Sequence, residues 1–169
     1  MELSLATILQ LITTLAITAA GIFAGVQIIL LKKQKARDSA IHMLQSTQTP
    51  EFMAAVNILF NLPENLTKEE IENFVGNKMN SILVMFGAFE SIGYLVFRRD
   101  ISLELVDNFF GGAIVLFWKK FSSYFIELRI KSKRENYGEW VEWLSDQLKK
   151  RGTKLQTKPA HIEYKEWKE

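Results

Sequence analysis

The sequence predicts an all-α protein in which one N-terminal transmembrane helix extends into a cytoplasmic helical bundle built on a long antiparallel helical hairpin. Three observations favour this fold class. The chain of 169 residues starts with a long uncharged apolar run. Its remainder repeats apolar side chains at spacings of three and four, which is typical of amphipathic helices. No segment alternates polar and apolar residues over the length of a strand. The expected domains are a transmembrane anchor (1–31), a juxtamembrane helix (32–48), the bundle (49–151) and a flexible basic tail (152–169).

Composition excludes several classes of protein. The 21 Lys and Arg residues nearly balance the 19 Asp and Glu residues, which disfavours a nucleic-acid-binding protein with a broad basic face. The absence of cysteine excludes disulfide frameworks, thiolate nucleophiles and cysteine-ligated metal sites. A hydrophobic share of 48% is enough for a packed core, so global disorder is also excluded.

The first expected element is the membrane anchor. No charged residue occurs from Leu3 to Leu31, a run of 29 positions. At about 1.5 Å per residue this run forms a helix of roughly 40 Å, longer than the ~30 Å hydrocarbon core of a bilayer. The thirteen Leu, Ile, Val and Phe side chains between Leu5 and Leu30 favour insertion by about 4–8 kcal/mol. A cleaved signal peptide is the alternative, but it should begin with basic residues, where this chain has Glu2, and have a shorter apolar core.

Basic residues follow the apolar run directly and set its expected orientation. They are Lys32, Lys33, Lys35 and Arg37, whereas the other flank offers only the α-amino group and Glu2. Because flanking basic residues are retained in the cytoplasm, the N-terminus should lie outside and the rest of the chain inside the inner (plasma) membrane. The same four side chains are expected to contact anionic lipid headgroups, each contributing about 1 kcal/mol.

One side of the anchor differs from the others. Small and polar side chains recur on it at spacings of three and four, at Thr7, Gln10, Thr14, Thr18, Gly21 and Gly25. At 100° per residue they share an arc of about 80°. Such a face lets another helix approach closely, so the expected partners are the lipid bilayer and, on this face, another membrane protein or a second copy. The alternative is that the threonines bond their own helix and that the glycines reflect ordinary membrane-helix composition.

Helical signals continue beyond the anchor. The juxtamembrane helix keeps an apolar stripe to about Gln45, and Thr-Pro-Glu at 49–51 predicts a capped helix that ends near Phe60. A capping box at 67–70 predicts a further helix that continues to about Phe97.

The last helices complete the expected hairpin and bundle. Ser102 can cap a helix that runs through Leu128, and the tight turn before it favours antiparallel packing against the preceding helix. A final amphipathic helix carries an apolar face from Tyr137 onward and ends before Gly152.

Two further apolar stretches are expected to be core helices rather than membrane spans. Residues 82–97 are only 16 in number and include Glu90, and residues 113–125 carry Lys119 and Lys120 in their middle. A full span needs about 20 apolar residues, and a central charge opposes insertion.

Glu90 is the most informative ionisable residue, because it interrupts an apolar run. A buried carboxylate needs a cation or hydrogen-bond donors, or it takes up a proton. We expect a buried ion pair with Arg129 that fixes the hairpin register, with Arg98 or Arg99 as alternative partners. The functional alternative is an acid that handles a proton.

The remaining residues predict no catalytic, cofactor or metal site. His42 and His161 lack further ligands at the spacing that metal sites use. No cofactor, nucleic acid or small-molecule substrate is therefore expected, and the protein is expected not to be an enzyme.

Short motifs in the helical part also carry a family resemblance. Phe89-Glu90 lies in one helix, Trp118 and Arg129 lie in the next, and a helix with Tyr and Trp comes last. Over about residues 5–150 this order resembles a domain-of-unknown-function family of small membrane-anchored helical proteins from bacteria, archaea and phages. The resemblance implies the architecture and no activity.

Two functions follow as hypotheses. The first is a non-enzymatic single-pass membrane protein that acts as an interaction or scaffolding module, either as an accessory subunit of a membrane complex or as a homo-oligomer. The alternative is a phage- or host-encoded defence or exclusion effector whose Phe- and Trp-rich helices perturb the bilayer.

Overall fold

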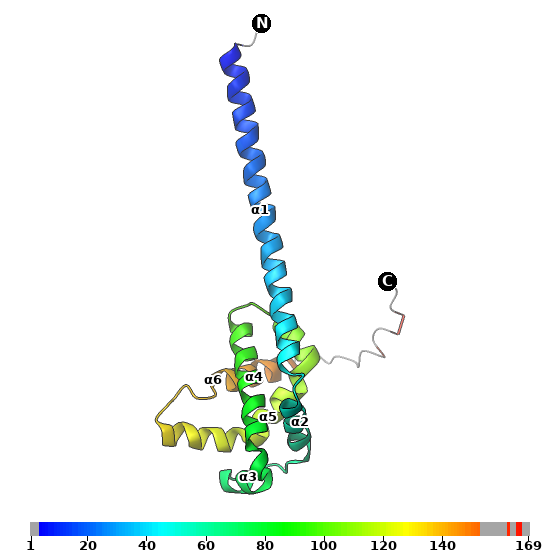
Figure 1. Ribbon diagram of the computed structural model, residues 1–169, viewed down its shortest axis with the longest axis vertical. Helices are drawn as coiled ribbons and strands as arrows, with labels where there is room; N and C mark the ends of the chain where they lie inside the picture. Colours follow the sequence, from blue (N-terminus) through cyan, green and yellow to red (C-terminus); the bar gives the residue numbers. More distant parts are fainter. Residues whose placement is uncertain (1–3, 153–161, 163–164, 167–169) are drawn as a thin grey trace.

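A single long helix dominates the shape of the molecule. The computed structural model describes residues 4–152, 162 and 165–166. Helix α1, Leu5–Ser46, has 42 residues and projects from the rest of the chain (Figure 1). It includes residues 5–31 of the expected anchor and residues 32–46 of the expected juxtamembrane helix without a break. Most of the tail expected at 152–169 lies outside the described residues.

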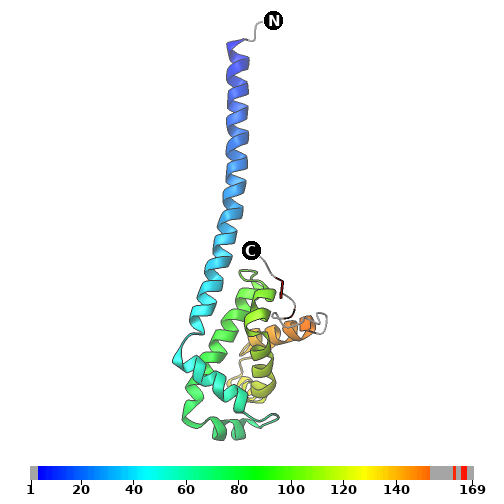
Figure 2. The ribbon, with the colours of Figure 1, turned by 90° about the vertical axis from the view of Figure 1, so that its right-hand side faces the viewer.

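The other helices form a bundle beside the C-terminal end of α1, as Figure 2 shows from the side. They are α2 (Pro50–Asn61), α3 (Lys68–Val75), the 3-10 turn η1 (Gly76–Lys78), α4 (Met79–Phe97), α5 (Leu103–Ser132) and α6 (Glu139–Gly152). The described part of the chain contains no strand, which confirms the all-α prediction.

The helix starts predicted from capping residues are confirmed. The side chains of Thr49, Thr67 and Ser102 each accept a hydrogen bond from the backbone N–H three residues later, at 3.1, 3.3 and 3.1 Å. Glu70 completes the capping box by accepting from the backbone N–H of Thr67 at 2.8 Å. These side chains satisfy N–H groups that a helix start otherwise leaves without a partner.

One predicted helix is wrong in its extent. The capping box at 67–70 was expected to open a helix that continues to Phe97, but the chain breaks at Gly76, where φ is +53°. Glycine has no Cβ and adopts this conformation with little steric cost, so it ends α3 and lets the chain turn into α4. The apolar spacing continues through the break, and for this reason spacing alone missed it.

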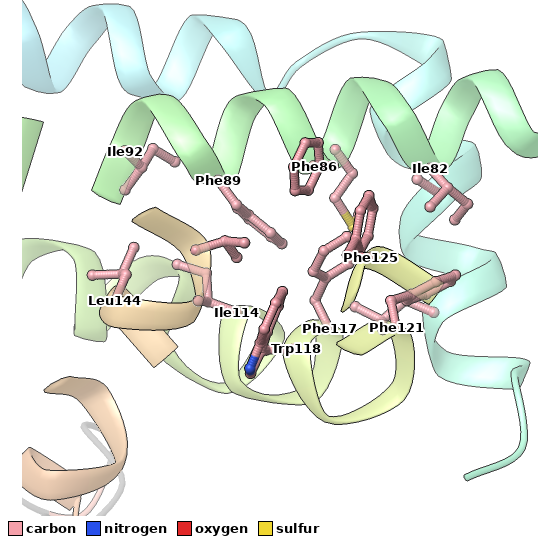
Figure 3. Packing of buried hydrophobic residues seen from close by; sticks show 14 of the residues in the cluster. Ile82, Phe86, Phe89, Ile92, Ile114, Phe117, Trp118, Phe121, Phe125 and Leu144 are labelled. Atoms are coloured by element: carbon pink, nitrogen blue, oxygen red, sulfur yellow. The ribbon is translucent and has the colours of Figure 1, made fainter. Parts of the chain in front are cut away.

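Aromatic rings fill the space between α4 and α5. The two helices run in opposite directions, and the rings of Phe86 and Phe125 stack with centroids 4.1 Å apart. Phe89 of α4 meets Phe117 of α5 edge-to-face at 5.4 Å. Helix α6 adds Leu144 to the same core (Figure 3). Full burial of such a side chain stabilises a fold by about 1.5–3 kcal/mol, so this cluster holds the three helices together.

Most of α1 is uncovered. Every residue from Ser4 to Asp38 is exposed, and the first buried side chain on the helix is Met43, with 2% of its surface accessible. Two stretches of the described chain are long and apolar enough to cross a membrane: α1, with none of its apolar window buried, and Lys68–Phe97, with 39% buried. The second stretch is broken at Gly76 and packs in the bundle. The apolar part of α1 has the form of a membrane span or an N-terminal signal sequence.

Candidate functional site

The small and polar face predicted on α1 is exposed along its whole length. The hydroxyl groups of Thr14 and Thr18 donate to the carbonyl oxygens of Gln10 and Thr14, both at 2.8 Å. An added Cβ at Gly21 or Gly25 would meet nothing within 4 Å. The threonines therefore satisfy their own donors, and close approach of another helix would depend on the glycines and on the Gln10 amide.

The four basic residues after the apolar run do not share one environment. Lys32, Lys33 and Arg37 are exposed on α1. Lys35 instead forms an ion pair of 2.8 Å with Asp100, which lies in the turn between α4 and α5. A hydrogen bond from Lys35 holds the pKa of Asp100 below its ordinary value. Lys35, itself 62% exposed, thus contacts the bundle through Asp100, and the predicted contact of the four basic residues with headgroups stays a prediction.

Glu90 has a closer partner than the predicted Arg129, although the charge of Arg129 still acts to lower the pKa of Glu90. The backbone N–H of Val141, in the first turn of α6, donates to Glu90 Oε1 at 2.7 Å. Arg129 pairs with Glu142 at 2.8 Å and donates to the carbonyl oxygen of Tyr137 at 3.0 Å. Glu90 therefore acts as an N-cap supplied by a neighbouring helix, because a carboxylate stabilises the positive end of a helix dipole. The alternative partners Arg98 and Arg99 are exposed at the far end of the same helix.

Burial dominates the chemistry of Glu90. It raises the pKa of this carboxyl group, and the hydrogen bonds from the Val141 and Trp140 backbone oppose that rise. Gly93 lies one turn along α4, where an added Cβ would be 2.5 Å from the Trp140 carbonyl oxygen. Glu90 and Gly93 together position α6 on α4, the first by capping its N-terminus and the second by allowing close contact.

Lys120 makes a structural contact in the core that was not predicted from the sequence. Lys120 is 8% exposed, and its Nζ donates to the carbonyl oxygens of Leu59 at 2.9 Å and Leu62 at 2.6 Å. The residue four positions after Leu59 is Pro63, which has no N–H to complete the helical hydrogen bond. Lys120 supplies the missing donor. A lysine in an apolar run, opposite a helix that ends at proline, was the available sequence signal.

Neighbouring Lys119 has a different role. It is exposed and forms an ion pair of 2.7 Å with Glu64, in the loop between α2 and α3. This pair lowers the pKa of Glu64. The two lysines that argued against a membrane span at 113–125 therefore both tie α5 to the end of α2 and its following loop.

An open apolar groove of about 490 Å³ lies between α5 and α6. Val115, Leu116 and Leu148 contribute to its lining, and an ion pair of 3.0 Å between Asp107 and Arg151 links the two helices beside it. In the described ranges, no group of three or more His, Asp or Glu side chains is placed to hold a metal ion. His42 is exposed on α1, and His161 lies outside the described residues.

Comparison with known proteins places this architecture in a family. No curated protein and no solved structure matches the chain. Residues 14–148 match the family described as "Domain of unknown function (DUF4760)". The matched region begins within the apolar part of α1 and ends in α6, so it includes the helices that form the bundle. Because the match covers most of the sequence, the chain belongs to the DUF4760 family.

Proposed function

We propose that the protein is a non-enzymatic single-pass membrane protein whose helical bundle is an interaction module on the cytoplasmic side of the inner (plasma) membrane. In this role it is an accessory or scaffolding subunit that assembles with another membrane protein through α1. The observation that carries the proposal is the uncovered apolar surface of α1.

The apolar part of α1 has no cover within the described chain. Leu5, Leu15 and Phe23 expose 74%, 69% and 65% of their surfaces, and the apolar side chains between them are similarly exposed. Soluble monomers rarely expose a contiguous apolar patch of more than a few hundred Å². A lipid bilayer would cover the apolar side chains on every side of α1. The basic residues that follow the apolar run favour a cytoplasmic bundle.

The direction of the small and polar face bears on the identity of the partner. Thr7 and Met43 are 36 positions apart, which is about ten turns at 3.6 residues per turn, so they lie on the same side of α1. Met43 is buried against the bundle. The face that includes Thr7, Thr18 and Gly25 is therefore directed toward the side on which the bundle lies.

This direction disfavours a symmetric dimer. In a parallel dimer through that face, each bundle would lie beneath the helix of the other copy, and the two bundles would compete for one volume. A helix of a different membrane protein, without a domain of similar size at that place, avoids the conflict. We therefore propose a heterologous partner, with close packing at Gly21 and Gly25.

Cysteine crosslinking in native membranes tests the proposal. The chain has no native cysteine, so Thr14→Cys and Thr18→Cys give single reactive positions on the face, and Ile12→Cys is the control on another side. The expected result is a crosslink to a protein of different mass from the face positions alone. The proposal fails if Thr14→Leu and Gly21→Leu change no contact and the protein remains monomeric.

A further inference from the structure

The end of the bundle beside α1 carries exposed aromatic and basic side chains. We call Tyr94, Phe97, Arg98 and Arg99 the turn patch, since they lie at the end of α4 and in the turn that follows. Phe97 and Tyr94 expose 55% and 44% of their surfaces, and both arginines are exposed. The Arg98 guanidinium lies 6.0 Å from the centre of the Tyr94 ring. Aromatic rings combined with arginines are typical of surfaces at the membrane–water interface.

The Lys35–Asp100 ion pair sets the height of this patch relative to the anchor. Lys35 is four residues after Leu31, which is about 6 Å along the helix axis. Its ammonium group is 2.8 Å from the Asp100 carboxylate, directly after Arg99. The polar layer on each side of a bilayer is roughly 5–8 Å thick. The level of the turn rests on the proposed function: with Lys32 and Lys33 at the interface, directly after a span that ends at Leu31, the turn lies at the level of the headgroups.

Charge is distributed unequally along the bundle. Segments 32–38 and 94–104 meet at the end beside the anchor and together contain six basic and three acidic residues. The opposite end, at 64–78, contains four acidic and two basic residues. Helix α3 lies at that opposite end, away from the N-terminal part of α1 (Figures 1 and 2). An anionic bilayer surface would attract the first end.

We propose that the turn patch is a second membrane contact, in which Arg98 and Arg99 bind anionic lipid headgroups and Phe97 lies at the interface. Phe97 is supported from within the bundle by Trp140, whose ring centroid is 4.8 Å away. The ring therefore has a fixed position at the end of α4. With α1, this contact holds the bundle against the bilayer in one orientation.

Single-cysteine probes on the full chain, reconstituted in phosphatidylcholine and phosphatidylglycerol vesicles, test the proposal. Fluorophores are attached in Glu104→Cys beside the patch, in Asn73→Cys at the opposite end as the matched control, and in Leu15→Cys within the anchor. Lipids with headgroup nitroxides should quench the probe at 104 and leave the probe at 73 bright. Adding Arg98→Gln and Arg99→Gln should weaken the quenching at 104, because the anchor still holds the turn near the bilayer but the headgroup contact is lost, whereas adding Lys78→Gln should leave it unchanged.

Three results would overturn the proposal. Equal quenching at positions 104 and 73, with the probe at 15 quenched by acyl-chain nitroxides, would refute the second contact and leave the anchor intact. A probe at 15 that no lipid nitroxide quenches would refute the proposed function as well. A probe at 104 shielded from both lipid and aqueous quenchers would place a second copy on the patch instead of lipid.

Discussion

Replacing Lys120 with methionine tests whether a buried cation holds the end of α2. The substitution keeps an unbranched apolar chain that ends at the position of the lysine Cε, and it removes the ammonium group. In the folded protein this group donates to the carbonyl oxygens of Leu59 and Leu62. Methionine leaves both oxygens without that donor, at a position where the lysine is 8% exposed.

The size of the effect follows from these two acceptors. A buried polar group left unpaired costs about 1–3 kcal/mol. The lost attraction between the ammonium group and the negative end of α2 adds roughly 0.3–1 kcal/mol. Methionine offsets part of this loss in the free energy of unfolding, because burying it does not require the desolvation of a charge. We expect Lys120→Met to lower the free energy of unfolding by about 2–3 kcal/mol, which shifts the midpoint of urea denaturation down by about 1–2 M.

The adjacent lysine provides the control. Lys119 is exposed and pairs with the exposed Glu64, and ion pairs of this kind contribute little to stability. Lys119→Met should therefore leave the midpoint close to that of the unchanged protein. The assay is urea unfolding of the full chain in mild detergent, followed by far-ultraviolet circular dichroism. Equal midpoints for the two variants would refute the assignment of Lys120 as the donor that holds α2.

Three further predictions concern α4 and the membrane. Gly93→Ala should destabilise the bundle by about 1–3 kcal/mol, because the added Cβ would meet the Trp140 carbonyl group. Gly87 lies in open space on the same helix, so Gly87→Ala should stabilise the bundle by about 0.5–1 kcal/mol. Chemical denaturation measures the free energy of unfolding of both variants. Burial raises the pKa of Glu90 above its ordinary value of 4.5, so the folded state binds its proton more tightly than the unfolded state. The stability of the unchanged protein relative to Glu90→Gln should therefore fall as the pH rises from 4.5 through the raised pKa, and a pH-independent difference would contradict this. Strong expression should leave the membrane potential steady in a dye assay, whereas a collapse would favour the defence or exclusion effector.

Local signals in the sequence predicted most of the fold. The caps at Thr49, Thr67 and Ser102 form as expected because each depends on a few neighbouring residues. The break at Gly76 escaped prediction since the apolar spacing continues across it and a glycine within a helical pattern is ambiguous. Spacing reports which side chains share a face, but it does not report the backbone conformation between them.

Contacts between distant segments were harder to predict. The sequence showed that Glu90 interrupts an apolar run, but several groups could have satisfied its carboxylate. The structure selects a backbone N–H at the start of α6, and backbone donors carry no signature in a sequence. Arg129 was an obvious cation by its position in the next helix, yet Glu142 is nearer to it. The partner of Glu90 depends on how α6 crosses α4, so it can be identified only from the three-dimensional structure.

Glu90 and Lys120 obey one electrostatic rule in opposite senses. The carboxylate lies at the N-terminus of α6, where helix N–H groups give a partial positive charge, and the ammonium group lies at the C-terminus of α2, where carbonyl groups give a partial negative charge. Each is carried by a long helix and satisfies the end of a shorter one. The nearest partner of each charge is a helix terminus of opposite partial charge rather than an ionised side chain. Glu90 and Lys120 are therefore explained by the way they attach α6 and α2 to the bundle. A functional role for either residue would require that its substitution still changes function when a second substitution has restored that attachment.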